Sequence, residues 1–203
     1  MLRFIESIRF ENDTMPLLQL HQKRIEATQM AAWGKVLHPP LEEIVFSQTG
    51  KYSFETNIKY KCRLLYDEST ASVTFQQYEQ AVINKLSVKI DDTIDYSYKY
   101  EDRRHIDKLK STSKTGTDII IVKNKLLTDS SYANIALFDG VRWFTPRQPL
   151  LNGVQRQYLL NNKIIYTKDI SMADLRNFGK IKLFNALVNW EEAWQLNIAD
   201  ILL

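Results

Sequence analysis

Strand-like and helix-like segments alternate along this sequence, and the alternation limits its fold more than any other feature. No internal repeat, low-complexity tract or long structureless stretch interrupts the pattern. The pattern therefore predicts a mixed α and β (α/β) protein. With 203 residues, of which 44% are hydrophobic and 25% charged, the chain is long enough for one large domain or two small ones.

Two lobes are expected, and the first is a small lobe over residues 1–90. Its helix at 17–33 should end at Gly34, because glycine readily adopts the left-handed conformation of a C-cap. The prolines at 39–40 break the chain before a second helix, which begins at about residue 41. The remaining segments of this lobe are typical of strands, at 3–10, 58–66, 71–77 and 84–90.

The second lobe is expected to be larger and to cover residues 98–203. The polar, acidic stretch 91–97 is the predicted linker between the two lobes. Helices are expected near 101–110 and from residue 153. Strands are expected near 118–123, 133–138, 163–166 and 180–184.

The charge balance and the cysteine content narrow the possible classes of function. The 27 basic and 24 acidic residues give a net charge of +3 and are mixed along the chain, so nucleic-acid binding has little support. The single cysteine, Cys62, cannot form an intrachain disulfide and is expected to be a small core residue in a reducing cytoplasm. The charged, strand-like start and the short apolar stretches give no sign of a signal peptide or a membrane anchor.

Common catalytic signatures are absent from the sequence. It has no Gly-rich phosphate loop, dinucleotide fingerprint, Cys-x-x-Cys pair or nucleophile-elbow serine. Its histidines, His21, His38 and His105, lack the spacing of metal ligands, so we expect no metal site. Four segments remain that could carry chemistry.

The first of these segments places an arginine on an otherwise apolar helical stripe. If residues 17–33 are helical, Arg24 shares one face with Leu17, Leu20, Ala27 and Ala31. A buried guanidinium requires an anion. Arg24 could therefore meet a structural carboxylate, extend to the surface or bind a phosphate.

The other three segments contain Lys99, Asp129 and Asn152. A lysine is usually solvated, but Lys99 stands at the junction of the predicted lobes, where cofactors often bind. Positive charges in a closed cleft would lower its pKa toward that of a Schiff-base lysine. Asp129 lies in a run of small polar residues that could also be a plain turn. Asn152 is expected to be the N-cap of the following helix, whose free amides could hold a phosphate.

Taken in this order, the segments resemble the class IV aminotransferase family, the group that holds branched-chain and D-amino-acid aminotransferases and 4-amino-4-deoxychorismate lyase. The resemblance runs from about Ile5 to Asn185. Residues 5–12 are similar to the family's opening Phe-Glu-Thr-Ile-Arg strand, and residues 21–24 to its His-x-x-Arg helix. Further similarities are at 99–103 (Lys-x-x-Asn-Arg), 129–134 (an acidic residue with asparagine five positions later), 151–156 (Leu-Pro-Gly-Val-Thr-Arg) and 183–187 (Thr-Asn-Ser/Ala-Leu).

The resemblance implies a two-lobed class IV aminotransferase-like fold, PLP fold type IV, with a small N-terminal and a larger C-terminal lobe. Pyridoxal 5'-phosphate is the implied cofactor, bound in the cleft between the lobes. The resemblance assigns the lysine that forms the Schiff base with this cofactor to Lys99. The other implied contacts are, for the phosphate, Arg24 and the amides of Val154 and Gln155 and, for the pyridine ring, Asp129 and Asn134.

The chain departs from the family pattern in several places. Asp102 replaces the usual asparagine, Asp129 replaces glutamate, and Gln155 replaces a residue with a hydroxyl group. The sequence also begins at Met1 almost on the first strand, without the leader that family members usually carry. We expect the cofactor residues to be intact and part of the substrate wall to be missing.

The function that this resemblance favours is that of a lyase, which would eliminate pyruvate from aminodeoxychorismate to give 4-aminobenzoate in folate biosynthesis. A D-amino-acid or branched-chain aminotransferase is the alternative, and a PLP-binding protein with little activity is the second alternative. Arg63 could meet a substrate carboxylate or be a surface or structural charge, and Asn185 and Ala186 match the family turn beside the substrate. A cytoplasmic homodimer with a small amino-acid-like substrate is implied, without nucleic-acid or membrane partners.

Overall fold

The chain forms two compact units in a computed structural model that describes residues 2–202. The first unit contains the described residues up to Gln80 together with Tyr98–Asp102. The second contains Ala81–Ser97 and the described residues from Arg103 onward.

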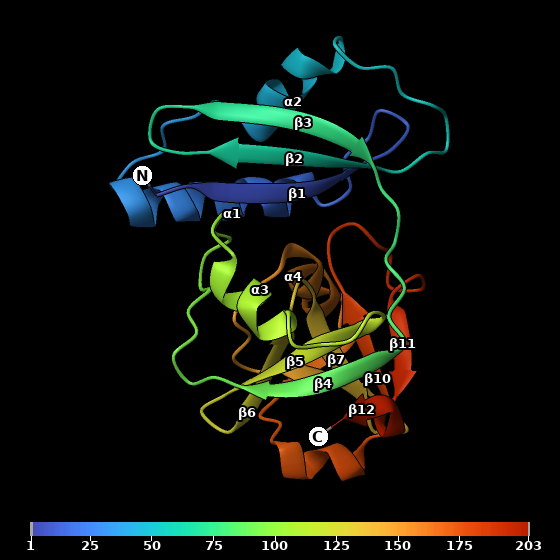
Figure 1. The fold of residues 1–203 in the computed structure, drawn as a ribbon. Helices are drawn as coiled ribbons and strands as arrows, with labels where there is room; N and C mark the ends of the chain where they lie inside the picture. The colour runs from blue at the N-terminus through green and yellow to red at the C-terminus, as the bar shows by residue number, and fades with distance from the viewer. Residues whose placement is uncertain (1, 203) are drawn as a thin grey trace. The chain divides into compact units, whose positions relative to one another are not determined.

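The first unit is built on a three-stranded antiparallel sheet in the order β1-β2-β3, with β2 in the middle (Figure 1). In β1, side chains alternate between the two faces, so Phe4, Glu6 and Ile8 lie on the same face. The expected strands at 3–10, 58–66 and 71–77 are confirmed. Their bounds are β1 Phe4–Phe10, β2 Tyr60–Tyr66 and β3 Ala71–Gln77.

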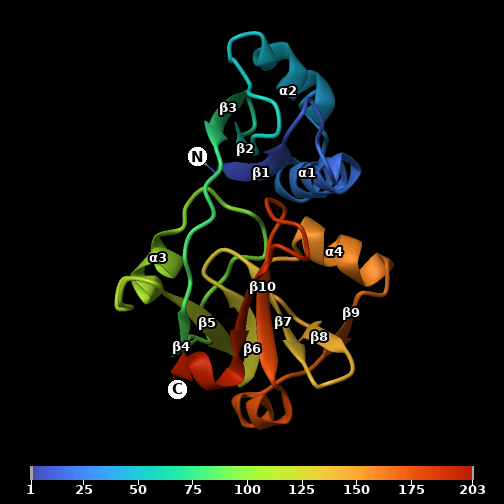
Figure 2. The ribbon, with the colours of Figure 1, turned by 90° about the vertical axis from the view of Figure 1, so that its right-hand side faces the viewer.

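Two helices, α1 (Leu18–Trp33) and α2 (Leu41–Thr49), cover one face of this sheet (Figure 2). The predicted C-cap of α1 is confirmed, since Gly34 has a φ of 72° and its N–H bonds to the carbonyl oxygen of Met30 at 3.0 Å. The core between helices and sheet is apolar and rich in aromatic rings. Its buried members include Phe4, Ile8, Phe10, Ile25, Leu41, Val45, Cys62, Leu64 and Tyr66.

The buried face of α1 differs from the predicted apolar stripe. Ala27 and Ala31 are exposed, whereas the buried positions are His21, Ile25, Thr28 and Gln29. Polar side chains can occupy this face because the protein supplies partners for them. The side-chain oxygen of Gln29, for example, accepts hydrogen bonds from the two backbone amides at 37 and 38.

The segment Tyr98–Asp102 joins the first unit at the free edge of β1. The N–H of Ile5 donates to the carbonyl oxygen of Lys99 at 2.9 Å, and Phe4 forms an antiparallel bridge with Tyr100. The rings of Phe4 and Tyr100 also stack, with centroids 5.5 Å apart. Backbone pairing with β1 therefore places Lys99 in the first unit, whereas the expected boundary put it at the start of the second lobe.

The second unit contains a nine-stranded sheet in the order β11-β10-β7-β6-β5-β4-β12, with β8 paired to β7 and β9. Helices α3 and α4 and the 3-10 helices η1 and η2 complete it. The bounds are β4 Lys85–Ile90, α3 Arg104–Lys110, β5 Thr117–Lys123, β6 Leu126–Ser130, β7 Asn134–Phe138, β8 Trp143–Pro146, α4 Val154–Asn161, β9 Ile165–Lys168, η1 Met172–Asn177, β10 Lys180–Phe184, β11 Trp194–Asn197, η2 Ile198–Asp200 and β12 Ile201–Leu202.

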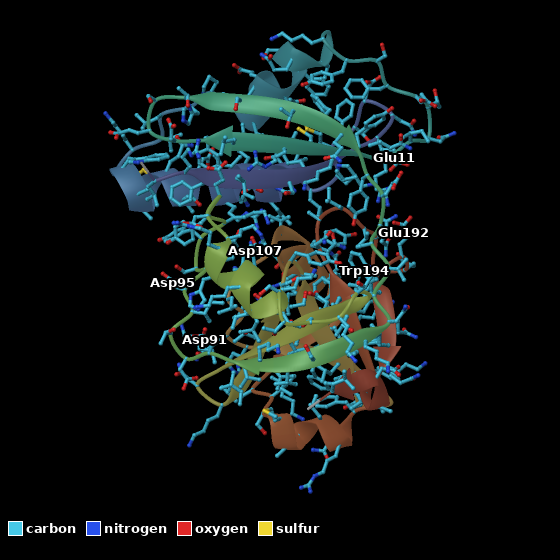
Figure 3. All side chains as sticks on the ribbon, viewed as in Figure 1. Glu11, Asp91, Asp95, Asp107, Glu192 and Trp194 are labelled. Carbon is cyan, nitrogen blue, oxygen red and sulfur yellow. The ribbon has the colours of Figure 1, made fainter. Side chains whose placement is uncertain are left out.

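Two further segments lie in a different unit from the one expected. The strand predicted at 84–90 exists as β4, but it pairs in parallel with β5 of the second unit. The predicted linker 91–97 is also part of that unit. Its turn is held by Asp91, whose Oδ1 accepts from the amides of Thr93 and Ile94, and Asp91 is labelled in Figure 3. The chain changes units at 80/81, 97/98 and 102/103 instead of once across a linker.

Sequence periodicity missed four strands: β6, which contains Asp129 of the small polar run, and the shorter β8, β11 and β12. β8, β11 and β12 contain two to four residues each, too few to show an alternating pattern. Tertiary contacts hold them, as at Trp194 of β11, whose indole N–H donates to the carbonyl oxygen of Ala81 at 2.6 Å (Figure 3). Among the described residues, no helix is both long and apolar enough to cross a membrane.

Candidate active site

A buried carboxylate in the first unit binds two side chains from α1. Glu6 of β1 accepts a hydrogen bond from Nε of Arg24 to its Oε1 at 2.8 Å, and Nη2 of Arg24 contacts its Oε2. The same Oε2 lies 2.7 Å from Nδ1 of His21. Glu6 and His21 are fully buried, and the Arg24 side chain is 12% exposed. Of the three partners considered for Arg24, the structural carboxylate is therefore present.

Charges and hydrogen bonds fix the ionisation of this trio. Burial alone would raise the pKa of Glu6, but the charge of Arg24 and the hydrogen bond from His21 outweigh it and lower the pKa to about 2. Burial lowers the pKa of His21, against the opposing effect of Glu6. His21 is thus neutral near pH 7, and its Nδ1–H donates to the Glu6 carboxylate.

Lys99 belongs to the same unit as this trio. Its positive charge contributes to the lowered pKa of His21, as does the charge of Arg24. Its backbone is held by Ile5, the residue next to Glu6 on β1. Arg24 and Lys99, two of the predicted cofactor residues, are therefore positioned by one strand.

Arg63 lies on β2, on the sheet face opposite Glu6, where it is paired in register with Ser7. Its Nη2 is 3.4 Å from Oε1 of Glu101, and Arg3 contacts the other carboxylate oxygen of Glu101 at 2.6 Å. The Arg63 side chain is 34% exposed. It has a structural ion pair and enough exposure to contact a solute.

In the second unit, Asp129 and Asn134 face each other across the tight β6–β7 connection. Their five-residue spacing thus has a simple structural basis, because the two positions are directly opposite in the hairpin. Nδ2 of Asn134 donates to Asp129 Oδ1 at 2.7 Å and to the carbonyl oxygen of Leu151 at 2.9 Å. The amide of Leu151 in turn donates to Asp129 Oδ2 at 2.9 Å. Both oxygens of the Asp129 carboxylate therefore have donors.

The Asp129 carboxylate has the opposite pKa shift to Glu6. Burial raises the pKa of Asp129 to about 6, although the hydrogen bonds from Leu151 and Asn134 and the charge of Arg156 work against this shift. Neutral donors stabilise an ionised carboxylate less than a hydrogen-bonded cation does. Asp129 therefore exchanges its proton in a pH range close to neutrality.

The helix α4 begins without a side-chain cap. Asn152 was predicted to be the N-cap, but the N-cap is Gly153, and Oδ1 of Asn152 instead accepts from Arg156 at 3.0 Å. A Cβ atom at Gly153 would lie 2.1 Å from Oδ1 of Asn134, so this position requires glycine. The first amides of an α-helix have no intrahelical partner. The start of α4, at Val154 and Gln155, therefore presents amide donors that no cap residue occupies.

The last predicted site residues, Asn185 and Ala186, form a turn directly after β10. Oδ1 of Asn185 accepts from the amide of Leu187 at 2.9 Å, which stabilises the turn. Both residues are half-buried. They belong to the second unit, as Asp129, Asn134 and the start of α4 do.

The sequence patterns assigned no role to Glu6 or His21, although both lie in segments that resemble the family pattern, 5–12 and 21–24. The sequence did contain a signal for Glu6. In the alternating pattern of β1 it occupies an inward position between Phe4 and Ile8, where a carboxylate requires a buried partner. Its helical partners could not be identified, because Arg24 is 18 residues away.

Comparisons with known proteins bear on this arrangement. The family model described as amino-transferase class IV matches residues 105–192. An uncharacterized protein of Haemophilus influenzae is 32% identical over 187 residues, which cover 92% of this chain and 98% of that protein. The crystal structure of a protein from Haemophilus somnus, named as a candidate 4-amino-4-deoxychorismate lyase, is 28% identical with a TM-score of 0.85. The match covers 92% of this chain and 97% of the Haemophilus somnus chain.

A more distant structure shares the fold. A protein from Mesorhizobium loti, named as a candidate amino-acid aminotransferase, has a TM-score of 0.77 at 18% identity and covers 92% of this chain and 96% of its own. The predicted family, mixed α/β fold and enzyme class are confirmed. This chain belongs to the class IV aminotransferase family.

Proposed function

We propose that this class IV enzyme uses pyridoxal 5'-phosphate to eliminate pyruvate from aminodeoxychorismate, leaving 4-aminobenzoate. The observation that carries the cofactor assignment is that neighbouring residues of β1 hold both groups, since Ile5 binds the backbone of Lys99 and Glu6 binds the side chain of Arg24. The family membership supports the same assignment. The choice of the lyase reaction rests on the similarity to the Haemophilus somnus protein.

The residues present fit this cofactor chemically. A phosphate needs oriented N–H donors and positive charge, and both are available at Arg24 and at the uncapped start of α4. A pyridine nitrogen needs a carboxylate, and Asp129 is a buried one with both oxygens held by donors. The shorter side chain of Asp129, compared with glutamate, keeps the chemical group that the family uses.

In the first unit, Lys99 would hold the cofactor covalently and Arg24 would bind its phosphate. With substrate bound, the Lys99 amine would remove the proton from the carbon that bears the substrate nitrogen. This step requires a neutral lysine amine. Pyridoxal phosphate, when bound, supplies an electron sink for the negative charge that develops at this carbon.

In the second unit, Asp129 would hold a proton at the pyridine nitrogen, and Asn134 keeps the carboxylate oriented. The amides of Val154 and Gln155 would donate to the phosphate. Gln155 provides its amide but no hydroxyl group, so its side chain cannot make the contact that a threonine makes. These roles require Asp129 to be ionised, which its pKa of about 6 permits at neutral pH.

The lyase reaction balances without a further reactant. The C–O bond to the enolpyruvyl group breaks as the proton leaves the neighbouring ring carbon, and the aromatic ring of 4-aminobenzoate forms. The departing enolpyruvate takes up that proton and becomes pyruvate. In an aminotransferase, by contrast, the proton would be returned to the cofactor, and a keto acid would be required as a second substrate.

The substrate contacts are proposed to come from Arg63 and from the turn at Asn185 and Ala186. Arg63 retains N–H donors beyond the one directed at Glu101, and a guanidinium pairs well with a substrate carboxylate. We further propose that the enzyme is a cytoplasmic homodimer, as its family resemblance implies. The free and buried state of Cys62 suits a reducing compartment.

The decisive test is to load the purified protein with pyridoxal phosphate and to record its visible absorbance. We expect an absorbance band that borohydride abolishes, with the added mass on the peptide that contains Lys99. The variant K99A should show neither. A wild-type protein that stays colourless would contradict the cofactor assignment. Pyruvate release from aminodeoxychorismate without a keto acid supports the lyase, whereas amino transfer to a keto acid would make it an aminotransferase.

A further inference from the structure

We infer that Glu6 and His21 act as positioning residues, which orient the guanidinium of Arg24 toward a phosphate group. This inference rests on the proposed function, because the phosphate is that of the cofactor. It concerns two residues that neither contact the reacting atoms nor belong to the predicted set of cofactor ligands. Their effect should be confined to the phosphate arm of the cofactor.

The geometry of the Glu6–Arg24 contact fixes the orientation of the guanidinium. Nε and Nη2 of Arg24 bind the two different oxygens of one carboxylate, so the pair is bidentate. Two parallel hydrogen bonds fix the plane of the guanidinium as well as its position. A guanidinium has five N–H donors, and Glu6 uses only two of them. The edge that carries Nη1 is therefore held in a defined direction away from Glu6.

His21 holds Glu6 in turn. The terminal torsion of a glutamate is broad, so a carboxylate with a single partner can rotate. Oε2 of Glu6 meets both Nη2 of Arg24 and Nδ1 of His21, and the second contact limits this rotation. The other ring nitrogen of His21, Nε2, is buried without a hydrogen-bond partner. An unsatisfied buried nitrogen costs stability, which is expected if the ring is placed for its contact with Glu6.

The strand β1 holds both Arg24 and Lys99. Glu6 binds Arg24 through its side chain, and the adjacent Ile5 binds the carbonyl oxygen of Lys99 through its backbone. Within the first unit, Arg24 and Lys99 are thus held by neighbouring residues of β1, Glu6 and Ile5. Small errors in the placement of binding groups weaken multi-point binding strongly. The trio therefore fixes Arg24 relative to Lys99.

Glu6 could instead act only through its charge, and this alternative predicts an effect of opposite sign. Its negative charge partly cancels that of Arg24 and repels a phosphate dianion. If charge were its only effect, removing the charge in E6Q would tighten phosphate binding. If Glu6 positions Arg24, E6Q should weaken binding, because an amide offers one acceptor where the carboxylate offers two.

The experiment compares two probes on the full-length protein: pyridoxal phosphate and pyridoxal, which lacks the phosphate. Binding of each is followed by the visible absorbance band in the wild type and in E6Q, H21L and H21N. For E6Q and H21L we expect affinity for pyridoxal phosphate to fall by about tenfold or more, the usual effect of losing a charge-assisted hydrogen bond. Affinity for pyridoxal should change by less than about twofold, because Arg24 does not contact it.

Two variants separate positioning from a general loss of stability. Asparagine in H21N can place an amide donor near the site of Nδ1, so this variant should restore most of the lost affinity. T28V removes a buried hydroxyl group from the same helix, and this hydroxyl bonds to Tyr66 and not to Glu6. It is the matched control, and its affinity for both probes should equal that of the wild type.

The outcomes distinguish the inference from the proposed function. Unchanged or tighter binding of pyridoxal phosphate by E6Q and H21L, in a wild type that binds both probes, would overturn the positioning role and leave the function intact. Equal losses for both probes would overturn it as well. A wild type that binds neither probe would contradict the proposed function itself. If H21L does not fold, E6Q carries the same test because it preserves the side-chain volume.

Discussion

Glu6 in the first unit and Asp129 in the second are both buried carboxylates with both oxygens hydrogen-bonded, yet their pKa values move in opposite directions. The pKa of Glu6 falls to about 2, whereas that of Asp129 rises to about 6. Glu6 meets the guanidinium of Arg24 directly, and Asp129 meets an amide side chain and a backbone N–H. Burial penalises both, and only the charged partner outweighs it.

The opposite pKa shifts indicate different roles for the two carboxylates. Glu6 has its countercharge inside the protein, so it remains ionised at any ordinary pH and can serve as a fixed anchor. Asp129 lacks a directly bonded cation, and a protonated pyridine nitrogen would supply one. On the proposed function, Glu6 is already paired with a cation of the protein, whereas Asp129 receives its cation only when the cofactor binds.

The largest effect should come from removing the cation of the first pair. In R24M the buried Glu6 keeps only a neutral donor, and we expect a loss of roughly 3–5 kcal/mol in the free energy of unfolding. The pKa of Glu6 should then rise as that of Asp129 does. Urea denaturation measures the loss. The control is R9M, which breaks the less buried Arg9–Glu11 pair and should cost less than about 1 kcal/mol. Equal losses in the two variants would contradict the comparison.

The second effect is acid sensitivity that originates at Glu6. The folded pKa of about 2 lies below the usual 4.5, so its contribution is full above pH 4.5 and is lost as the pH falls toward 2. A shift of this size corresponds to about 3 kcal/mol. Denaturation at several pH values should show this slope in the wild type and a flatter one in E6Q. Parallel slopes would show that Glu6 is not the source.

The third effect has the opposite sign and originates at Asp129. Its folded pKa of about 6 lies above the usual 3.8, so its contribution to stability is full below pH 3.8 and is lost as the pH rises through 6. The decline from this group is about 3 kcal/mol. D129N should remove it. Pyridoxal phosphate should reduce it in the wild type, because a positive ring nitrogen would lower the pKa of Asp129. An undiminished decline with the cofactor bound would contradict the ring contact.

The smallest effect should come from disturbing the neutral donors of Asp129. In G153A the new Cβ would lie 2.1 Å from Oδ1 of Asn134 and would displace the side chain that donates to Asp129. We expect a loss of about 1–3 kcal/mol and a higher pKa for Asp129. G179A is the control, because a Cβ at Gly179 would meet no atom within 4 Å. Thermal unfolding of both variants makes the comparison.

Much of the fold could be predicted from local pattern. The long strands and helices were predicted nearly to their ends, and Gly34 ends α1 as expected. The strand β6 was hidden by its polar residues, and β8, β11 and β12 were too short to be found, since tertiary contacts such as that of Trp194 with Ala81 hold such strands. The boundaries between units were also beyond local reasoning. The placement of β4 and of Lys99 depends on strand pairing between segments far apart in sequence.

The sequence by itself determined which residue types are available and in what order, and therefore the family and the candidate residues from Arg24 to Gln155. Only the tertiary structure decided how they are used. It gave Arg24 a carboxylate 18 residues away, moved the N-cap from Asn152 to Gly153 and turned α1 so that His21 is buried. The physical reason is that burial and the identity of the nearest partner set the pKa and orientation of a side chain, and both are properties of packing.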